Sequence, residues 1–272
     1  MTAPALISQS TSRYIGQCIY CKSTNDLSDE HIVPHGLAGP WQLLSASCPK
    51  CCKITSAFER AVLRKYFIQV RTKLGLPTYH AKKRPKSFKF TVKINGKEQV
   101  IEIPVSDITT LFAMPQIKKP GYITNNRQGK GFSITGMSLH GSRSGLEDFR
   151  AKYNLESFNY TVTLDNSFLR LLAKIAYGMV VHQYGLDAIQ EAFVLPSILG
   201  MKDDVGVWVG CKDPDKSPDL LPKERVLHRI NVMVNDKNEL AADIRLFADF
   251  QTPEYLVIVG RLKYGTSYGG NK

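Results

Sequence analysis

Two stretches of the chain place apolar residues at three- and four-residue steps, which is the period of an amphipathic helix. The first covers about residues 49–74 and stops before Gly75 and Pro77. Its apolar positions are Ile54, Phe58, Ala61, Val62, Tyr66 and Val70. The second follows the cap residue Asp165 and stops at Gly185, and its apolar positions are Phe168, Leu171, Leu172, Ile175 and Met179. The pattern predicts one long helix in each stretch.

Strands are predicted where apolar and polar residues alternate. Residues 88–94 alternate in this way, and Asn95-Gly96 supplies the turn of a tight hairpin before Val100–Ile103. In the last third of the chain, β-branched stretches joined by polar turns predict further strands at 207–209, 226–234, 241–248 and 256–262. Between about Thr109 and Gly145 the signals are mixed, and we expect loops with one strand.

The segment from His80 to Lys86 has no apolar period and four of its residues are basic, so it predicts a linker or a second phosphate-contacting arm. We therefore place a domain boundary at residues 81–87. Residues 1–80 form one predicted domain, and residues 88–272 form a larger α+β domain with an antiparallel sheet. We find no internal repeat, phosphate-binding loop or dinucleotide fingerprint.

Composition indicates a folded chain, because 43% of the 272 residues are apolar. The first sixteen residues do not resemble a secretory signal, and no apolar run approaches the roughly 18 residues that would span a bilayer. We expect a cytoplasmic protein with no membrane partner.

The formal charge of +12 is concentrated in one place. Residues 53–90 hold eleven basic residues against the single acid Glu59, whereas residues 1–52 are neutral. Such a segment predicts contacts with a polyanion. On the first helix Lys53, Arg60, Arg64 and Arg71 project within a narrow arc, and the following segment adds Lys82, Lys83 and Arg84.

The cysteines indicate a metal site. Cys18-Ile-Tyr-Cys21 and Cys48-Pro-Lys-Cys51 are two Cys-x-x-Cys pairs separated by 26 residues, and two such pairs supply the four thiolates of a tetrahedral zinc site. Four sulfurs leave no open coordination position, so this zinc is expected to be structural.

Between the two pairs lies Leu27-Ser-Asp-Glu-His-Ile-Val-Pro-His-Gly-Leu-Ala-Gly39, an acid–histidine pair followed by a Pro/Gly-rich loop. Together with the spacing of the cysteines and the later Thr-Ser-Ala-Phe-Glu run, this resembles the HNH endonucleases, most closely the subgroup with paired Cys-x-x-Cys knuckles. The resemblance covers about residues 15–60. It implies a ββα-metal fold and hydrolysis of phosphodiester bonds in nucleic acid, DNA above all.

By this resemblance His31 is the general base and Glu30 binds one Mg²⁺ or Mn²⁺, an ion that offsets charge developing on the phosphate. In the subgroup the residue directly after the fourth cysteine is usually Asn or His, a second metal ligand, but here it is Cys52. A thiolate is a poor ligand for Mg²⁺. Either the catalytic ion is softer, or His35 or Asp29 supplies the missing ligand, or the site has lost activity.

Two other functions remain open. A catalytically disabled module would bind nucleic acid without cutting it. Alternatively, the chain is a partner-activated subunit of a defence or mobile-element assembly, with the domain at 88–272 contacting a protein partner. Cys211 and the four histidines His80, His140, His182 and His228 are interpreted as structural, because each stands alone.

Overall fold

The N-terminal part of the chain forms a small sheet with a helix behind it. The computed structural model describes residues 11–141, 143–160, 162–214 and 226–263. Its first sheet has the order β1–β3–β2, with β2 antiparallel and β1 parallel to the central strand β3. The bounds of these elements are Ser12–Tyr14 for β1, Ser28–His31 for β2 and Gln42–Ser47 for β3, and helix α1 follows at Pro49–Ala61. The short turn η1 (His35–Leu37) lies in the connection between β2 and β3.

The long helix predicted for residues 49–74 is interrupted. After α1 comes a π-helical segment, η2 (Val62–Tyr66), and then a separate helix, α2 (Ile68–Lys73). The amide of Phe67 bonds to the carbonyl of Val62, five residues back, which closes a wider turn than an α-helix has. Both Tyr66 and Phe67 are buried, at 6% and 0% exposure, and the wider turn allows these two neighbouring rings to face the core.

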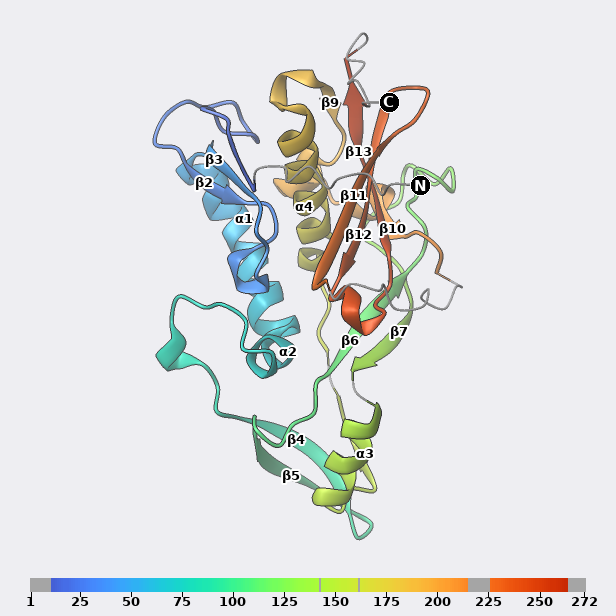
Figure 1. Cartoon of the computed structure of the whole chain (residues 1–272). Helices are drawn as coiled ribbons and strands as arrows, with labels where there is room; N and C mark the ends of the chain where they lie inside the picture. The colour runs from blue at the N-terminus through green and yellow to red at the C-terminus, as the bar shows by residue number, and fades with distance from the viewer. Residues whose placement is uncertain (1–10, 142, 161, 215–225, 264–272) are drawn as a thin grey trace, which may run out of the picture.

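Helix α4 (Asn166–Tyr184) is the centre of the molecule. It packs against α1 on one side and against the C-terminal sheet on the other (Figure 1). Every residue from Leu171 to His182 is buried, as expected for a helix covered all round. The predicted ends of this helix are confirmed, since the Asp165 side chain accepts a hydrogen bond from the Ser167 amide and Gly185 follows the last turn with a φ of 85°.

The C-terminal sheet is antiparallel, with the order β10–β13–β12–β11 and with β9 added beside β13. Its strands are β9 (Ile189–Ala192), β10 (Val209–Cys211), β11 (His228–Val234), β12 (Glu239–Leu246) and β13 (Tyr255–Leu262). Short elements join them: η4 (Leu186–Ala188), α5 (Leu195–Ile198), α6 (Val205–Trp208) and η5 (Ala248–Phe250). The strand predicted at 207–209 begins only at Val209, because Val207 belongs to α6.

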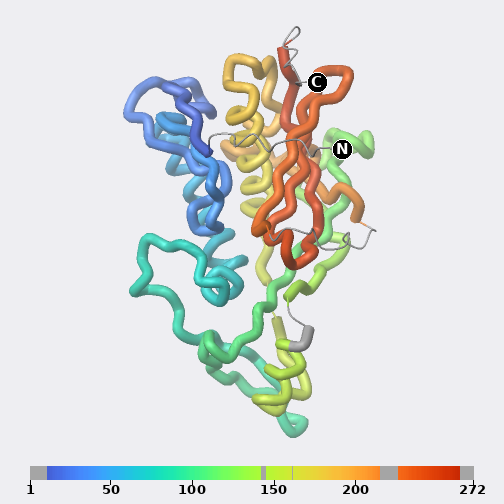
Figure 2. Tube along the Cα trace, in the orientation of Figure 1, coloured from blue at the N-terminus to red at the C-terminus, as the bar shows by residue number. Residues whose placement is uncertain are grey.

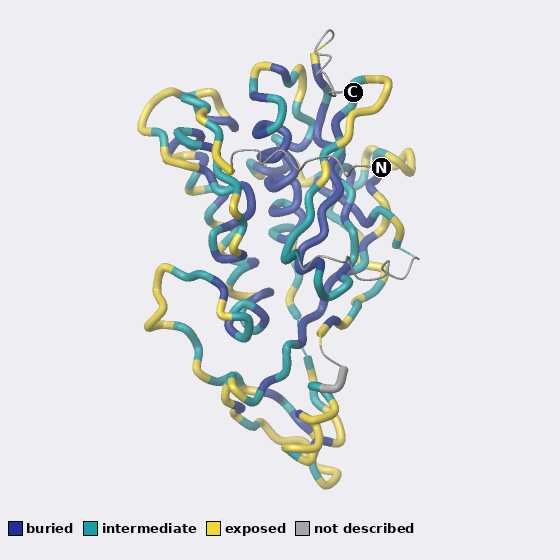
Figure 3. Tube along the Cα trace, viewed as in Figure 1, coloured by how far each residue is buried: buried dark blue, intermediate teal, exposed yellow. Residues whose placement is uncertain are grey.

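A second, smaller hydrophobic core lies in the lobe below α2 (Figure 1). The predicted hairpin is confirmed as β4 (Ser87–Ile94) and β5 (Lys97–Pro104), with Asn95 and Gly96 in the turn at positive φ. Strand β8 (Ser157–Phe158) pairs with β4, and α3 (Arg143–Lys152) covers them. Much of the lobe is exposed (Figure 3).

The region between 109 and 145 is more regular than expected, because β6 (Leu111–Ile117) and β7 (Ile134–Gly141) form an antiparallel pair. The first of these strands was not predicted because it contains Pro115, a residue that is unusual inside a strand. The carbonyl of Pro115 accepts a hydrogen bond from the buried Tyr255 hydroxyl, at 2.8 Å, so the strand is held from the side by the C-terminal sheet.

The main hydrophobic core does not follow the predicted division at residues 81–87. It joins residues 18–76 to residues 112–117 and 168–262, while the small core takes in residues 90–108 and 149–155. Segment 78–86 runs as an open connection from α2 to the small lobe and includes η3 (Ala81–Lys83) (Figure 2). The described chain is thus a mixed α+β structure with mainly antiparallel sheets. None of its described helices has the length and apolar character needed to cross a membrane.

His228 on β11 ties the C-terminal sheet to the N-terminal unit. Its Nε2 donates to the carbonyl of Leu37 at 2.7 Å, and its Nδ1 accepts from the Phe247 amide at 3.2 Å. Both bonds require the neutral ring with the proton on Nε2. Burial lowers the pKa of His228 to about 4.

We expect this histidine to make unfolding easier in mild acid. Between about pH 6.5 and pH 4 the unfolded His228 binds a proton that the folded one does not. Stability therefore rises with pH across this window, by roughly 3 kcal/mol in total and by roughly 2 kcal/mol between pH 5 and pH 7. Denaturant unfolding at pH 7 and pH 5 measures the loss, and a His228→Gln variant should lose less than the wild type between these two values. Equal losses in the two proteins would contradict the assignment.

Candidate metal and nucleic-acid site

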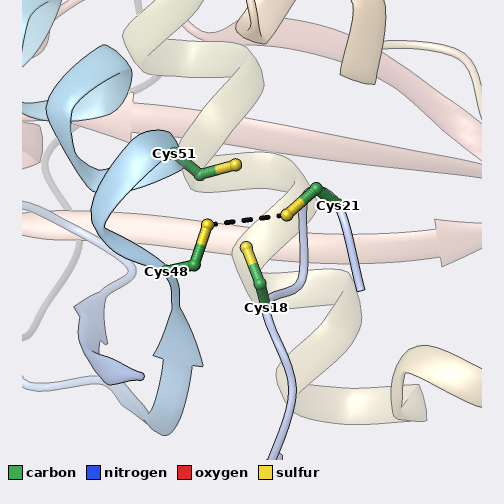
Figure 4. Close-up of side chains that lie close together, drawn as sticks. All are labelled: Cys18, Cys21, Cys48 and Cys51. Carbon is green, nitrogen blue, oxygen red and sulfur yellow. Dashed lines mark hydrogen bonds between the residues drawn. The ribbon is translucent and has the colours of Figure 1, made fainter. Parts of the chain in front are cut away.

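The four cysteines of the two Cys-x-x-Cys pairs converge on one point (Figure 4). Their sulfur atoms all lie within 4.8 Å of one another, and the Cys21 and Cys48 sulfurs are 3.5 Å apart. Tetrahedral zinc with bonds of about 2.3 Å needs sulfur–sulfur distances of about 3.8 Å. The four cysteines could therefore bind a metal ion such as zinc.

Local backbone geometry produces this arrangement. In the first pair, the Lys22 amide bonds back to the Cys18 carbonyl at 2.8 Å, and Lys22 takes a positive φ of 63°, which folds the chain into a tight knuckle. In the second pair, Cys48 caps α1 and Pro49 occupies its first turn. Burial opposes ionisation of Cys48, but hydrogen bonds from the Cys51 amide and the Cys21 thiol outweigh it and lower the pKa of Cys48 to about 7.

Beside the cysteines, three charged side chains meet in the interior. The Lys174 ammonium, from the middle of α4, lies 2.7 Å from Oε1 of Glu30 on β2 and 2.6 Å from Oε1 of Glu59 on α1. Lys174 and the side chains of Glu30 and Glu59 are 1%, 8% and 19% exposed. The ammonium also donates to the main-chain carbonyl of His31. We call these three residues the buried ion cluster.

Electrostatics in the buried ion cluster favour a charged lysine. Burial on its own would lower the pKa of Lys174, but the carboxylates of Glu30 and Glu59 raise it above its usual range. Burial raises the pKa of Glu59, and the ammonium opposes that rise only in part. Lys174 therefore remains protonated and compensates the carboxylate of Glu30.

The predicted set of ligands for Mg²⁺ or Mn²⁺ does not come together. Within the described ranges, the four cysteines are the only group of three or more His, Cys, Asp or Glu donors close enough to share an ion. Glu30 faces Lys174, and Asp29 accepts a hydrogen bond from the Ser45 amide at 2.9 Å. The residues present therefore do not fit a hard divalent ion at Glu30.

Cys52, in the first turn of α1, is half-buried beside the same cluster. Burial raises the pKa of its thiol, and the nearby carboxylates of Glu30 and Glu59 raise it further. At neutral pH it is a neutral thiol, a still weaker ligand for Mg²⁺ than a thiolate.

His31 lies on the more open side of β2. It is half-buried, whereas the neighbouring Glu30 is 6% exposed. Its cross-strand partner is Gln42 on β3, whose amide nitrogen is 3.3 Å from Nδ1 and 3.4 Å from Nε2. Burial lowers the pKa of His31, and the charge of Lys174 and the neighbouring His35 add to the effect. The ring is therefore neutral at pH 7 and able to accept a proton.

Two further rings continue from His31 along the surface. The ring centroids of His31 and His35 are 5.6 Å apart, and His35 stacks on Tyr79 at 4.7 Å. Tyr79 is 78% exposed, an unusual position for a large aromatic ring. We call His31, His35 and Tyr79 the aromatic row.

Most of the predicted basic residues border a pocket next to this row. The pocket has a volume of about 470 Å³ and lies between η2, α2 and segment 78–85. Its charged and titratable lining residues are Arg64, Arg71, His80, Lys83 and Arg84, with no acid among them. Lys53 and Arg60 are exposed on α1 and Lys82 is exposed beside the pocket, but none of these three lines it.

Arg71 is held rigidly at the pocket wall. Its guanidinium donates to the main-chain carbonyls of Gly36 at 2.6 Å, Leu63 at 3.0 Å and Pro77 at 3.1 Å. Burial lowers the pKa of Arg71, and the charges of Arg84 and Arg64 lower it further. The pocket is thus lined by several positively charged side chains and by no acidic one.

Several of these residues could not be selected from motifs. Gln42 and Tyr79 belong to no motif. Glu59 was noted only as the last residue of the Thr-Ser-Ala-Phe-Glu run and as the single acid in the basic segment. Lys174 did leave a signal, because it is a lone charge in the apolar run Leu-Leu-Ala-Lys-Ile-Ala-Tyr. A charged residue on a helix that is covered on all sides requires an opposite charge from another element.

Comparison of the chain with protein-family models, with curated proteins and with solved structures found no match.

Replacing one cysteine of the cluster should release the metal and loosen the N-terminal unit. We expect Cys51→Ser to purify without zinc and to melt about 10 °C or more below the wild type, because a structural zinc contributes several kcal/mol to folding. Elemental analysis and thermal unfolding measure the two effects. Cys211→Ser is the matched control, since Cys211 is buried but lies outside the cluster. Full zinc content in Cys51→Ser would refute a four-sulfur site.

Proposed function

We propose that this protein acts on nucleic acid through an HNH-type ββα unit, formed by β2, β3 and α1, and hydrolyses phosphodiester bonds with His31 as general base. The observation that carries the proposal is the continuity of the aromatic row with the arginine-lined pocket. A neutral, half-buried imidazole stands at one end, and a concentration of positive charge at the other.

The arrangement of the N-terminal elements supports an HNH-type unit. Two antiparallel strands are followed by a helix, the Glu30–His31 pair ends the first strand, and the four cysteines link the region before that strand to the start of the helix. In this unit the zinc is a scaffold, because four sulfur ligands complete its coordination.

The aromatic row and the pocket suit a nucleic-acid strand. Thr78 and His80 line the pocket while Tyr79, between them, stacks on His35, so the two features share one stretch of backbone. Arg71 strengthens the link, because it lines the pocket and binds the carbonyl of Gly36, the residue after His35. Phosphates would occupy the pocket, and an unpaired base would stack on the exposed ring.

The chemistry assigned to His31 is removal of a proton from the attacking water. The water oxygen bonds to phosphorus, its proton passes to the neutral imidazole, and the bond from phosphorus to the leaving oxygen breaks, with that oxygen taking a proton from solvent. The lowered pKa keeps the ring unprotonated at neutral pH. Gln42 restrains the orientation of the ring.

A second candidate is a module that binds nucleic acid without cutting it. The observation that favours it is the state of the expected metal position, where Cys52 is a neutral thiol and Glu30 is paired with Lys174. Both candidates require the pocket, and they differ only in cleavage.

A cleavage panel separates the two candidates. The zinc-loaded protein is incubated with supercoiled plasmid, single-stranded DNA and RNA, in EDTA and with Mg²⁺, Mn²⁺, Ni²⁺ or Zn²⁺. We expect cleavage of at least one substrate, and a loss of about 100-fold or more in His31→Ala, the range typical of a lost general base. Equal cleavage by His31→Ala would refute the role of His31, and no cleavage under any condition would favour the binding module. Zinc content and circular dichroism of the variant control for folding.

Binding should depend on the pocket more than on the total charge. We expect Arg64→Ala/Lys83→Ala to bind single-stranded oligonucleotides at least about tenfold more weakly, with a shallower salt dependence, because two phosphate contacts are lost. The control removes the same charge from the distant hairpin, as Lys89→Ala/Lys97→Ala, where both side chains are exposed. Fluorescence anisotropy across a salt series measures both variants. An equal loss in the control would show that only net charge matters.

A further inference from the structure

The surroundings of the Lys174 ammonium resemble those of a bound metal cation. Four oxygen atoms surround Nζ: one carboxylate oxygen each from Glu30 and Glu59, and the main-chain carbonyl oxygens of His31 and Ile32, the last at 3.4 Å. Carboxylate and carbonyl oxygens are the donors that hard cations prefer in proteins. An ammonium group can occupy the same kind of oxygen cage by donating its three N–H bonds.

We infer that Lys174 has taken over the place of the divalent ion at Glu30, so that this carboxylate fastens the N-terminal unit to α4 instead of binding a metal. The inference rests on the proposed HNH-type unit, because that resemblance is what assigns a divalent ion to Glu30. The inference goes beyond that unit, because it places Lys174, from α4 of the same chain, where the resemblance expects the ion.

Lys174 is fixed in this position. Its neighbours Ala173 and Ile175 are both 0% exposed, and the helix that carries them is covered by α1 on one side and by the sheet on the other. The side chain itself is 1% exposed, so withdrawing it would move a charge through the core. Lys174 therefore stays beside Glu30 and does not swing away to open the site.

Burial also excludes Lys174 from direct catalysis. A phosphate bound near the half-buried His31 would approach from solvent, whereas the ammonium is behind β2 and contacts the carbonyl of His31 from the interior. It can influence His31 only through its charge. Any hydrolysis by this chain is then independent of an ion held at Glu30.

Direct measurement of Mn²⁺ binding tests the inference without relying on cleavage. The zinc-loaded wild type and Glu30→Gln are titrated with Mn²⁺, and free Mn²⁺ is followed by electron paramagnetic resonance. We expect no bound Mn²⁺ that depends on Glu30. One Mn²⁺ bound by the wild type and lost in Glu30→Gln would overturn the inference.

Replacing the ammonium gives the complementary test. Lys174→Met keeps the length of the side chain and removes its charge, which leaves two carboxylates and two carbonyls facing each other. We expect this variant to gain one Mn²⁺, and the double variant Lys174→Met/Glu30→Gln to lose it again. A folded Lys174→Met that binds no Mn²⁺ would also overturn the inference. If Lys174→Met does not fold, the comparison of wild type with Glu30→Gln decides the question alone.

The two proposals can fail separately. A protein that cuts nothing but binds no Mn²⁺ at Glu30 loses the nuclease proposal and keeps the inference. A protein that cuts DNA with Mn²⁺ held at Glu30 keeps the nuclease proposal and loses the inference.

Discussion

A charged amine with almost no access to water must have opposite charge beside it, and this requirement organises the centre of the molecule. Removing one partner of a buried ion pair costs about 3–5 kcal/mol, because the other charge is left without water or counter-ion. Lys174 enters from α4, while Glu30 and Glu59 enter from β2 and α1. These two ion pairs therefore favour one relative position of the sheet, the first helix and the central helix. Apolar packing alone would specify that position less sharply.

The four cysteines and the buried ion cluster both stabilise the N-terminal unit, through different contacts. The cysteines connect the turn before β2 to the first turn of α1, a connection within the N-terminal part of the chain. The ion cluster connects that part to α4, and the Tyr177 hydroxyl adds a 2.6 Å bond to the Ile19 carbonyl inside the first knuckle. The N-terminal unit is thus held together by a cysteine cluster that could bind a metal ion, and it is joined to the main core through Lys174 and Tyr177. This leaves its outer side free to carry polar and aromatic groups.

Local patterns were enough to predict much of the fold. The cap at Asp165, the turn at Asn95-Gly96 and the two Cys-x-x-Cys pairs each act within a few residues, and all three appear where the sequence placed them. The predictions failed where distant contacts decide. The π-helical turn at 62–66 exists because two adjacent rings must reach the core, and the strand through Pro115 is held by Tyr255, 140 residues away. The ion pair of Glu30 with Lys174 is a further example, because the two residues are 144 positions apart and no local pattern links them.

The buried ion cluster also bears on how such a protein can change over evolutionary time. A small folded unit is transferable between genes only when its surface requires nothing specific from the new neighbour. Here the N-terminal unit carries two acids whose counter-charge is encoded more than a hundred codons downstream. A gene fragment that ends after α2 would encode Glu30 and Glu59 but not Lys174. Fused to another protein, the two acids would have no lysine to pair with. The two halves of this chain therefore depend on each other, because separating them would leave Glu30 and Glu59 without their counter-charge.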